Sequence, residues 1–458
     1  MSADRDARPD TIVAIGTPPG RGGIGIVRVS GPRSGALAEA LAGRVPAPRV
    51  ATYATFRDAQ GAPLDAGLLL YFTAPHSYTG EDALELQAHG SPAALRLLVG
   101  RCIELGARLA QPGEFTRRAF LNGRLDLAQA EGVADLIEAA TSTAARAAAR
   151  SLTGAFSREI DALVDAVVEV RMITEASLDF PEEDIAFVRA ADAAARVAKL
   201  AAEVDAITRR AASGARLRDG LAVVLAGRPN VGKSSLLNRL ARDDVAIVTD
   251  VPGTTRDTVE RPIEVGGVPV TIVDTAGLRD TDDAVERIGI ARTWEAIGRA
   301  DAIVLLVDAR AGDDEVATDE RALLERLPAA VPRIVVHNKS DLAGAAARRD
   351  ARAGAAHVWL SALTGDGVAL LEDALAAIAG VDTAAEDTVL ARERHVVALR
   401  AAGAHLRAAA GLLDAAAPPL ELFAEELRLA QAELAAITGA FTADVLLGVI
   451  FSRFCIGK

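Results

Sequence analysis

The chain has 458 residues, of which 50% are hydrophobic and 25% are charged, and its formal net charge is −13. This length predicts about two to four domains with buried cores, and the composition excludes a wholly disordered chain. The acidic balance argues against a protein that simply coats nucleic acid or an anionic membrane.

The two cysteines, Cys102 and Cys455, exclude a disulfide scaffold and a structural zinc site, and they fit a reducing cytoplasm. The first ten residues include three aspartates and no apolar run, so we expect no signal peptide. No stretch of about 18 apolar residues is free of charge. We therefore expect a cytoplasmic protein with no membrane partner.

Residues 1–124 are expected to form a mixed α/β domain. Short β-like runs occur at 11–15, 25–29 and 68–72, separated by proline and glycine, and an apolar run over 93–109 predicts a helix. The segment carries 14 arginines against 11 acidic residues. The negative excess of the chain therefore lies in the other segments.

Residues 125–215 and 381–458 share an alanine-rich, helical composition. In the first of these, Leu163, Val167, Val170 and Ile173 have the spacing of one helix face. Pro181 and the acidic residues after it predict a break, and a second helix is expected over 190–210.

The segment between them, 216–380, alternates strands with helices. Strands are expected at 221–226, 268–273, 302–307, 333–337 and 358–360, and helices at 234–241, 285–299 and 319–327. This alternation predicts a doubly wound, mostly parallel sheet. Because the flanking compositions match, we interpret the chain as a helical domain interrupted by an inserted α/β domain.

A P-loop pattern follows the first strand of the insert. Residues 227–234 read Gly-Arg-Pro-Asn-Val-Gly-Lys-Ser and open a helix, as the motif requires. Backbone N–H groups of such a loop surround the β-phosphate, and the helix N-terminus adds positive potential. Lys233 would reach the β- and γ-phosphates and Ser234 would bind Mg²⁺. An ordinary glycine-rich turn is the alternative.

Further motifs follow in the order expected of a GTP-binding domain. Thr255 precedes the strand over 268–273, and Asp274 to Gly277 follow it, where they would complete the Mg²⁺ shell and sense a γ-phosphate. The carboxylate of Asp341, in Asn-Lys-Ser-Asp, can accept hydrogen bonds from N1–H and the 2-amino group of guanine. Residues 361–363 would place backbone amides near the guanine O6. Each motif alone is compatible with a polar turn, but together they predict GTP binding.

Hydrolysis requires a residue that orients water. Leu278 follows the Asp-x-x-Gly motif, where small GTPases of the Ras type have a glutamine, and leucine cannot do this. Glu286 is a candidate, and a solvated helix face is the alternative for it. The side-chain oxygen of Asn230 could bind a monovalent cation that supplies positive charge, or Asn230 could be only a turn residue.

Three other segments have no assignment from the residues alone. Residues 17–31 form a glycine-rich loop that leads into a strand, residues 112–131 read as a linker, and 454–458 (Phe-Cys-Ile-Gly-Lys) read as a frayed tail. Together with Ser-Tyr-Thr-Gly-Glu-Asp at 77–82 and the P-loop order, they resemble the tRNA modification GTPase family (MnmE/TrmE). The resemblance covers nearly the whole chain.

The resemblance implies an organisation and a reaction. The domains would be a tetrahydrofolate-binding and dimerisation domain at 1–124, a helical domain from 125–215 and 381–458, and an inserted G domain at 216–380. It implies a homodimer that joins an FAD-dependent partner in a heterotetramer. Together they would add an aminomethyl or carboxymethylaminomethyl group to C5 of the wobble uridine of certain tRNAs. The donor would be 5,10-methylenetetrahydrofolate, with 5-formyltetrahydrofolate as a bound analogue.

The resemblance also assigns site residues. Folate contacts fall on Arg28, Glu85, Arg124 and Lys458, and Arg124 replaces the usual lysine of the motif. Mg²⁺ falls to Ser234 and Thr255, K⁺ to Asn230, Thr249, Val251 and Thr254, and the water-orienting role to Glu286. The nucleotide site comprises Asn230, Val231, Gly232, Lys233, Ser234, Ser235, Thr249, Asp250, Val251, Pro252, Gly253, Thr254, Thr255, Asp274, Thr275, Ala276, Gly277, Asn338, Lys339, Ser340, Asp341, Ser361, Ala362 and Leu363.

Some questions stay open at the level of sequence. Cys455 is either a thiol with a chemical role or a small buried side chain. A ribosome-assembly GTPase that acts as a switch, without one-carbon chemistry, is the competing function. A homologue that hydrolyses GTP but has lost its tRNA role is a third.

Overall fold

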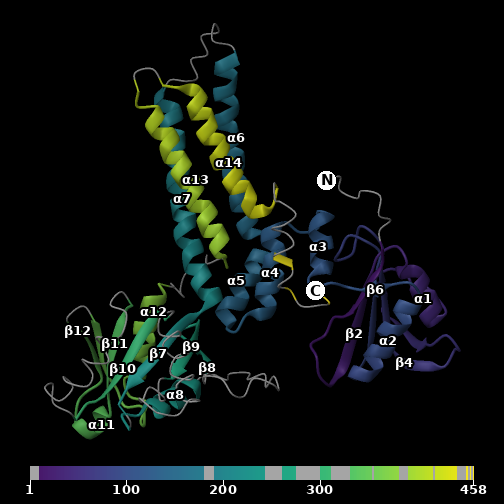
Figure 1. Cartoon of the computed structure of the whole chain (residues 1–458), viewed down its shortest axis with the longest axis horizontal. Helices are drawn as coiled ribbons and strands as arrows, with labels where there is room; N and C mark the ends of the chain where they lie inside the picture. Colours follow the sequence, from purple (N-terminus) through teal and green to yellow (C-terminus); the bar gives the residue numbers. More distant parts are fainter. Residues whose placement is uncertain are drawn as a thin grey trace, which may run out of the picture. The chain divides into compact units, whose positions relative to one another are not determined.

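The computed structural model describes residues 10–179, 190–228, 230–242, 260–274, 300–310, 331–352, 355–380, 390–415, 418–440 and 450–451, with Phe454 and Gly457. The chain forms two compact units (Figure 1). One contains Met1–Ala134, Leu152–Arg171 and Arg428–Lys458, and the other contains Asp135–Ser151 and Met172–Leu427.

The first unit is built on a six-stranded sheet with the strand order β3-β4-β5-β2-β1-β6. All neighbouring strands are antiparallel except β1 and β6, which are parallel. The strands are β1 (Ile12–Ile15), β2 (Gly22–Ser30), β3 (Thr52–Arg57), β4 (Pro63–Phe72), β5 (Ala83–Gly90) and β6 (Arg108–Leu109).

Two helices, α1 (Ser34–Ala42) and α2 (Pro92–Glu104), cover one face of this sheet. Their buried leucines share one core with alternate residues of the strands, as expected of a half-buried antiparallel sheet. Phe115 packs against the opposite face with Ile12 and Ala14. The expected mixed α/β fold of this segment is confirmed.

Two predictions for this unit were wrong in detail. The helix expected over 93–109 ends at Glu104, because Gly106 adopts φ +96° and turns the chain into β6. The linker expected over 112–131 contains α3 (Glu114–Leu121) and the start of α4 (Leu127–Glu138). Asp126 and Gln129 form a reciprocal capping box at the start of α4, with hydrogen bonds of 2.8 and 3.0 Å.

Long helices account for the alanine-rich segments. They are α5 (Ser142–Leu152), α6 (Ala155–Asp179), α7 (Ala190–Asp219), α13 (Glu393–Leu412) and α14 (Leu420–Thr438). Leu163, Val167 and Val170 are buried on one face of α6, as their spacing predicts. Helix α7 continues beyond the expected end to Asp219, and α13 packs along it (Figure 1). The predicted break at 181–184 lies outside the described residues.

A seven-stranded sheet lies between α7 and α13 in the sequence, with the order β12-β13-β11-β10-β7-β9-β8. Its central pairs are parallel, and only the outer pairs β8–β9 and β12–β13 are antiparallel. The strands are β7 (Leu221–Gly227), β8 (Glu260–Val265), β9 (Val268–Asp274), β10 (Ala302–Asp308), β11 (Arg333–Asn338), β12 (Arg348–Arg352) and β13 (Ala355–Trp359). The predicted mostly parallel sheet is confirmed.

Three described helices accompany this sheet: α8 (Lys233–Arg242), α11 (Ser340–Ala343) and α12 (Val368–Ala379). Buried leucines of α8 and α12 share one core with the sheet. The helices expected at 285–299 and 319–327 lie outside the described residues. Within the part of the chain that the structure describes, no helix combines the length and apolarity needed to cross a bilayer.

Candidate functional site

The segment that joins β7 to α8 has the backbone geometry of a phosphate-binding loop. Gly227 has a φ of +147°, and a Cβ there would lie 2.5 Å from the carbonyl oxygen of Leu306. Gly232 has a φ of +100°, and a Cβ there would lie 2.3 Å from Nδ2 of Asn338. Only glycine fits these positions, so the loop requires both glycines of the predicted motif.

Lys233 begins α8 and its ammonium reaches back over the loop. Nζ donates hydrogen bonds to the carbonyl oxygens of Gly227 at 2.6 Å and Arg228 at 3.0 Å. The first turn of α8 holds no acidic residue, so nothing there opposes the positive potential of the helix N-terminus. Ser234 and Ser235 are exposed in the same turn. The loop therefore offers an ammonium, a helix N-terminus and hydroxyl oxygens to an anion and its cation.

Asn338 ties this loop to the segment predicted to contact the base. Its side chain is buried, with 2% of the residue exposed. Nδ2 donates to the carbonyl oxygen of Val231 at 2.7 Å, and Oδ1 accepts from the backbone N–H of Ala362 at 2.9 Å. One amide group therefore holds the phosphate loop and the 361–363 segment together.

Lys339 makes a second connection across the site. It adopts a left-handed conformation, and Nζ donates to the carbonyl oxygen of Asn230 at 2.8 Å and to Oδ2 of Asp308 at 2.9 Å. The guanidinium of Arg310, assisted by Lys339, holds the pKa of Asp308 well below its usual range, although burial alone would raise it. Asp308 therefore stays ionised and keeps the Lys339 ammonium over the loop.

The predicted base-contacting residues follow β11 and β13 at the same edge of the sheet. Asp341 lies in α11 and its side chain is exposed. Arg239 of α8 donates to the carbonyl oxygens of Ala362 at 3.3 Å and Leu363 at 2.5 Å. The side chain of Leu363 is 76% exposed. The backbone of this segment is thus held in place whatever side chain stands at position 363.

Other predicted nucleotide residues are only partly described. The backbone of Asp274 ends β9 opposite Leu225 of β7, at the edge of the sheet that carries the phosphate loop. Residues 249–255, 275–278 and Glu286, which include the other predicted Mg²⁺ and K⁺ ligands, lie outside the described residues. The structure thus brings together residues 230–235, 338–341 and 361–363.

The predicted folate residues of the first unit are also described in part. Arg28 of β2 lies directly opposite Glu85 of β5, and its Nε and Nη2 lie 3.0 and 2.9 Å from Oε1 of Glu85. The guanidinium carbon is 5.5 Å from the ring centre of Tyr78 and 5.9 Å from that of Phe115. Sequence reasoning did not single out these two aromatic residues, which hold Arg28 by cation–π contact.

The turn after Tyr78 connects this pair to Arg124. Gly80 has a φ of +79°, and a Cβ there would lie 3.1 Å from Cγ of Arg124. Gly457, in the C-terminal motif, packs so tightly on Ile15 that a Cβ would overlap its carbonyl oxygen. The frayed tail expected from the residues alone is therefore wrong at Gly457. Lys458 and Cys455 lie outside the described residues.

An ion-pair network joins α3 to Glu81, which follows Gly80. Arg108 and Arg118 lie 2.6 and 2.9 Å from Oε1 of Glu114, Arg118 also pairs with Glu81 at 3.0 Å, and both arginines pair with Asp10. Burial alone would raise the pKa of Glu114, but hydrogen bonds from Arg108, Arg118 and a backbone N–H lower it below its ordinary value of 4.5. The carboxylate is therefore ionised at neutral pH and anchors α3.

Comparisons with known proteins agree along the whole chain. The model of the MnmE helical domain matches residues 127–455, and that of the GTP-binding protein TrmE N-terminus matches residues 11–124. The tRNA modification GTPase MnmE of Azoarcus sp. (strain BH72) is 57% identical over 458 residues, which cover 100% of both chains. That of Chromobacterium violaceum is 56% identical over 451 residues, which cover 98% of this chain and 99% of the relative.

The chain belongs to the MnmE family of tRNA modification GTPases. The resemblance identified from the motifs is thereby confirmed. Among solved structures, the G domain of the T. maritima FeoB iron transporter is 27% identical and covers 35% of this chain and 98% of its own, with a TM-score of 0.25.

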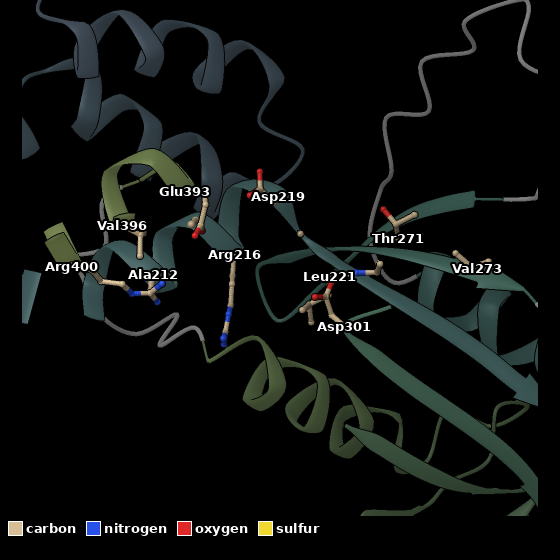
Figure 2. A pocket seen from close by; sticks show the side chains of 13 residues that line it. Ala212, Arg216, Asp219, Leu221, Thr271, Val273, Asp301, Glu393, Val396 and Arg400 are labelled. Atoms are coloured by element: carbon tan, nitrogen blue, oxygen red, sulfur yellow. Dashed lines mark hydrogen bonds between the residues drawn. The ribbon is translucent and has the colours of Figure 1, made fainter. Parts of the chain in front are cut away.

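In this MnmE family member a second candidate site is a pocket of about 550 Å³ (Figure 2). The end of α7, the start of α13, and strands β7 and β9 line it, with Arg216, Asp219 and Glu393 among its polar residues. Leu221 in its wall begins β7, whereas the phosphate loop follows the end of that strand. Ligands of open α/β sheets bind at the carboxyl ends of the strands, so this pocket is not the nucleotide site.

Sequence reasoning also missed the side chain that joins the two ends of the inserted domain. Asp135 of α4 is 3% exposed and accepts hydrogen bonds from Arg218 at 2.8 Å and from Arg392 at 2.7 Å. Arg218 lies just before β7, and Arg392 caps the start of α13. One buried carboxylate thus binds both the arginine that precedes the seven-stranded sheet and the arginine at the start of the helix that follows it.

Proposed function

We propose that this protein hydrolyses GTP in its inserted domain and acts on tRNA, whose wobble uridine it helps to modify at C5. The convergence of residues 230–235, 338–341 and 361–363 at the carboxyl edge of one parallel sheet supports GTP as the nucleotide. Their joint bracing by Asn338 is the observation that carries this assignment. The tRNA substrate is proposed from the names of the full-length relatives.

The described residues suggest how the nucleotide is held. The backbone N–H groups of 230–235 and the α8 N-terminus would bind the phosphates, and Lys233 would exchange its two carbonyl partners for phosphate oxygens. Asp341, exposed at the base end, would accept from guanine N1–H and its 2-amino group. Lys339 joins Asn230 of the phosphate loop to Asp308 at the end of β10.

The oxygen donors of the site suit Mg²⁺ and K⁺. The exposed hydroxyl of Ser234, with Thr255, would hold Mg²⁺, a cation that prefers hard oxygen ligands and neutralises charge on phosphates. Asn230, with Thr249, Val251 and Thr254, would hold K⁺, which supplies further positive charge next to the phosphates.

Glu286 would then orient the attacking water, since Leu278 cannot. As water attacks the γ-phosphorus, the bond from phosphorus to the β–γ bridging oxygen breaks, and GDP and phosphate are released. The bound nucleotide and K⁺ would bring the G domains of a homodimer together, and hydrolysis would release them. The helical region, which is joined to the insert at Asp135, would transmit this change to the tRNA-modifying site.

The first unit would bind the one-carbon donor, 5,10-methylenetetrahydrofolate. Arg28 and Glu85 form a guanidinium–carboxylate pair. A folate has a glutamate tail with carboxylates, which suit a guanidinium, and a pterin ring with hydrogen-bond donors, which suit a carboxylate. Arg124 and Lys458 would add positive charge for the glutamate tail. An FAD-dependent partner would supply the redox chemistry within a heterotetramer.

Two experiments test this function. Mass analysis of tRNA wobble uridines from a deletion strain should show loss of the C5 modification and its return when the gene is restored. Titration with 5-formyltetrahydrofolate should show binding that Arg28→Ala weakens at least tenfold. GTP hydrolysis with no change at wobble uridines and no folate binding would instead favour a ribosome-assembly type switch.

Hydrolysis rates measured in KCl and in NaCl test the cation. We expect a faster rate in KCl, and equal rates would contradict the K⁺ site. Glu286→Ala should slow hydrolysis while GTP still binds. An unchanged rate would remove Glu286 from its assigned role.

A further inference from the structure

Strand β12 at one edge of the seven-stranded sheet carries a concentration of positive charge. Arg348, Arg349 and Arg352 are exposed on it, and Asp350 is the only acidic residue in the strand. The surrounding segment 216–380 is acidic, with 26 acidic against 20 basic residues. Among the described strands, β12 has a neighbour on one side only, β13 (Figure 1). The backbone on the other side of β12 is therefore not paired with any described strand.

Two of these arginines lie on a stack of rings, Arg348 directly across from it in the strand register and Arg352 through its long side chain. Trp359 of β13 lies directly opposite His337 of β11 on one side and Arg348 of β12 on the other. The rings of Trp359 and His337 are 4.2 Å apart and nearly parallel, at 6°. The guanidinium carbons of Arg348 and Arg352 lie 3.7 and 5.0 Å from the centre of the Trp359 ring. Such stacking fixes the plane of a guanidinium and leaves its edge and outer face accessible.

The two guanidiniums are only partly neutralised. Nε of Arg348 lies 3.3 Å and Nη2 of Arg352 lies 3.6 Å from Oδ2 of Asp350. Asp350 is the one described residue that accepts a hydrogen bond from Arg348, whose guanidinium has five N–H donors. Like charges that converge on one ring favour an anionic partner. Arg349 points to the opposite face of the strand, so positive charge borders both sides of the edge.

Charge alone has a simpler explanation, because charged side chains on edge strands prevent pairing with other chains. That role needs no stacked geometry. RNA-binding proteins stack unpaired bases on guanidinium planes and pair guanidinium edges with phosphates, and the fixed planes of Arg348 and Arg352 suit both contacts. We propose that the β12 edge, defined by Arg348, Arg349 and Arg352 with the buried ring of Trp359 under two of them, is a contact surface for RNA, namely the tRNA substrate. This inference rests on the proposed function.

The proposal is tested by binding of a fluorescein-labelled, unmodified tRNA transcript to the full-length protein, followed by fluorescence anisotropy between about 50 and 200 mM KCl. The double variant Arg348→Gln/Arg352→Gln should bind about tenfold more weakly. The slope of log affinity against log salt should become shallower by about two, because two phosphate contacts are lost. Arg348→Lys should keep the salt slope and still lose affinity, since the stacked plane is gone.

The matched control is Lys199→Gln/Arg407→Gln on α7 and α13, which removes the same charge at exposed positions elsewhere in the same unit. It should leave affinity and salt slope near those of the unsubstituted protein. Equal losses in the two double variants would overturn the β12 surface and leave the tRNA function standing. Absence of tRNA binding by the unsubstituted protein would overturn both. Unchanged melting temperature and GTP hydrolysis would show that the β12 variants are folded.

Discussion

The amide nitrogen of Asn338 donates to the carbonyl oxygen of Val231 at 2.7 Å, across 107 residues of sequence. Asn338 ends β11, and Val231 lies in the loop that follows β7. Strand β10 lies between these two strands in the sheet, so this hydrogen bond spans a strand rather than joining neighbours. Oδ1 of the same side chain accepts a hydrogen bond from the backbone N–H of Ala362. The phosphate loop and the segment predicted to contact the base therefore depend on one buried amide.

Replacement of Asn338 by alanine should weaken guanine nucleotide binding by about ten- to a hundredfold. It removes two buried hydrogen bonds, and each contributes about 0.5–1.5 kcal/mol. The carbonyl of Val231 and the N–H of Ala362 would also be left without their partner. Titration with a fluorescent GDP analogue measures the affinity. Leu342→Ala, which truncates a 62% exposed side chain in the adjacent helix, is the control and should bind normally. Similar nucleotide affinities of Asn338→Ala and Leu342→Ala would show that the two hydrogen bonds of Asn338 are not needed for nucleotide binding.

Asp341→Asn should change which base is preferred. The carboxylate is expected to accept from N1–H and the 2-amino group of guanine, and an amide presents one acceptor and one donor instead. Affinity for GTP should fall at least tenfold, and affinity for xanthosine triphosphate, which has a carbonyl oxygen at C2, should rise. Competition titrations with the two nucleotides measure the ratio. If Asp341→Asn kept the original preference for GTP, Asp341 would not contact the base.

The inserted domain could be predicted well because its central strands are continuous apolar runs. Strands β7, β9, β10 and β11 occur within one residue of their expected ends, as buried parallel strands read clearly in sequence. The edge strands β8 and β12 were missed. β12 reads Arg-Arg-Asp-Ala-Arg, which has no apolar alternation, and it is identified only by its pairing with β13. The phosphate loop was found because its residues are contiguous.

Sites whose partners are distant in sequence could not be predicted in this way. Arg218 and Arg392 lie 83 and 257 residues from Asp135, and nothing local marks that aspartate as their shared partner. The cation–π contacts of Arg28 with Tyr78 and Phe115 likewise depend on how β2, the turn between β4 and β5, and α3 meet. Only the fold brings such residues together.

Two substitutions that each remove an ion pair in the second unit can be compared. Asp135→Ala should lower the free energy of unfolding more than Asp205→Ala. It would leave two arginines, 28% and 14% exposed, without their shared carboxylate, and loss of one partner of a buried pair costs about 3 kcal/mol. Asp205→Ala breaks the exposed pair with Arg407 (49% and 54% exposed) and should cost about 0.5 kcal/mol. Urea unfolding followed by circular dichroism measures both variants. Similar losses of unfolding free energy would show that Asp135 does not hold the ends of the insert.

Glu114 should make the first unit lose stability in acid. Its pKa is lower in the folded protein than the ordinary 4.5, so its contribution to stability is complete above that value and disappears as pH falls through the lower, folded value. Glu114→Gln should reduce the unfolding free energy by about 1–2 kcal/mol at pH 7, because Arg108 and Arg118 lose their charged partner. The difference from the unsubstituted protein should shrink as pH falls below 4.5 toward the lower pKa of the folded protein, because the unfolded chain takes up the proton first. Urea unfolding from pH 7 down to about pH 3 measures this, with Glu39→Gln on the exposed face of α1 as a control expected to follow the unsubstituted curve. A constant difference over the whole pH range would mean that the charge of Glu114 does not stabilise the fold.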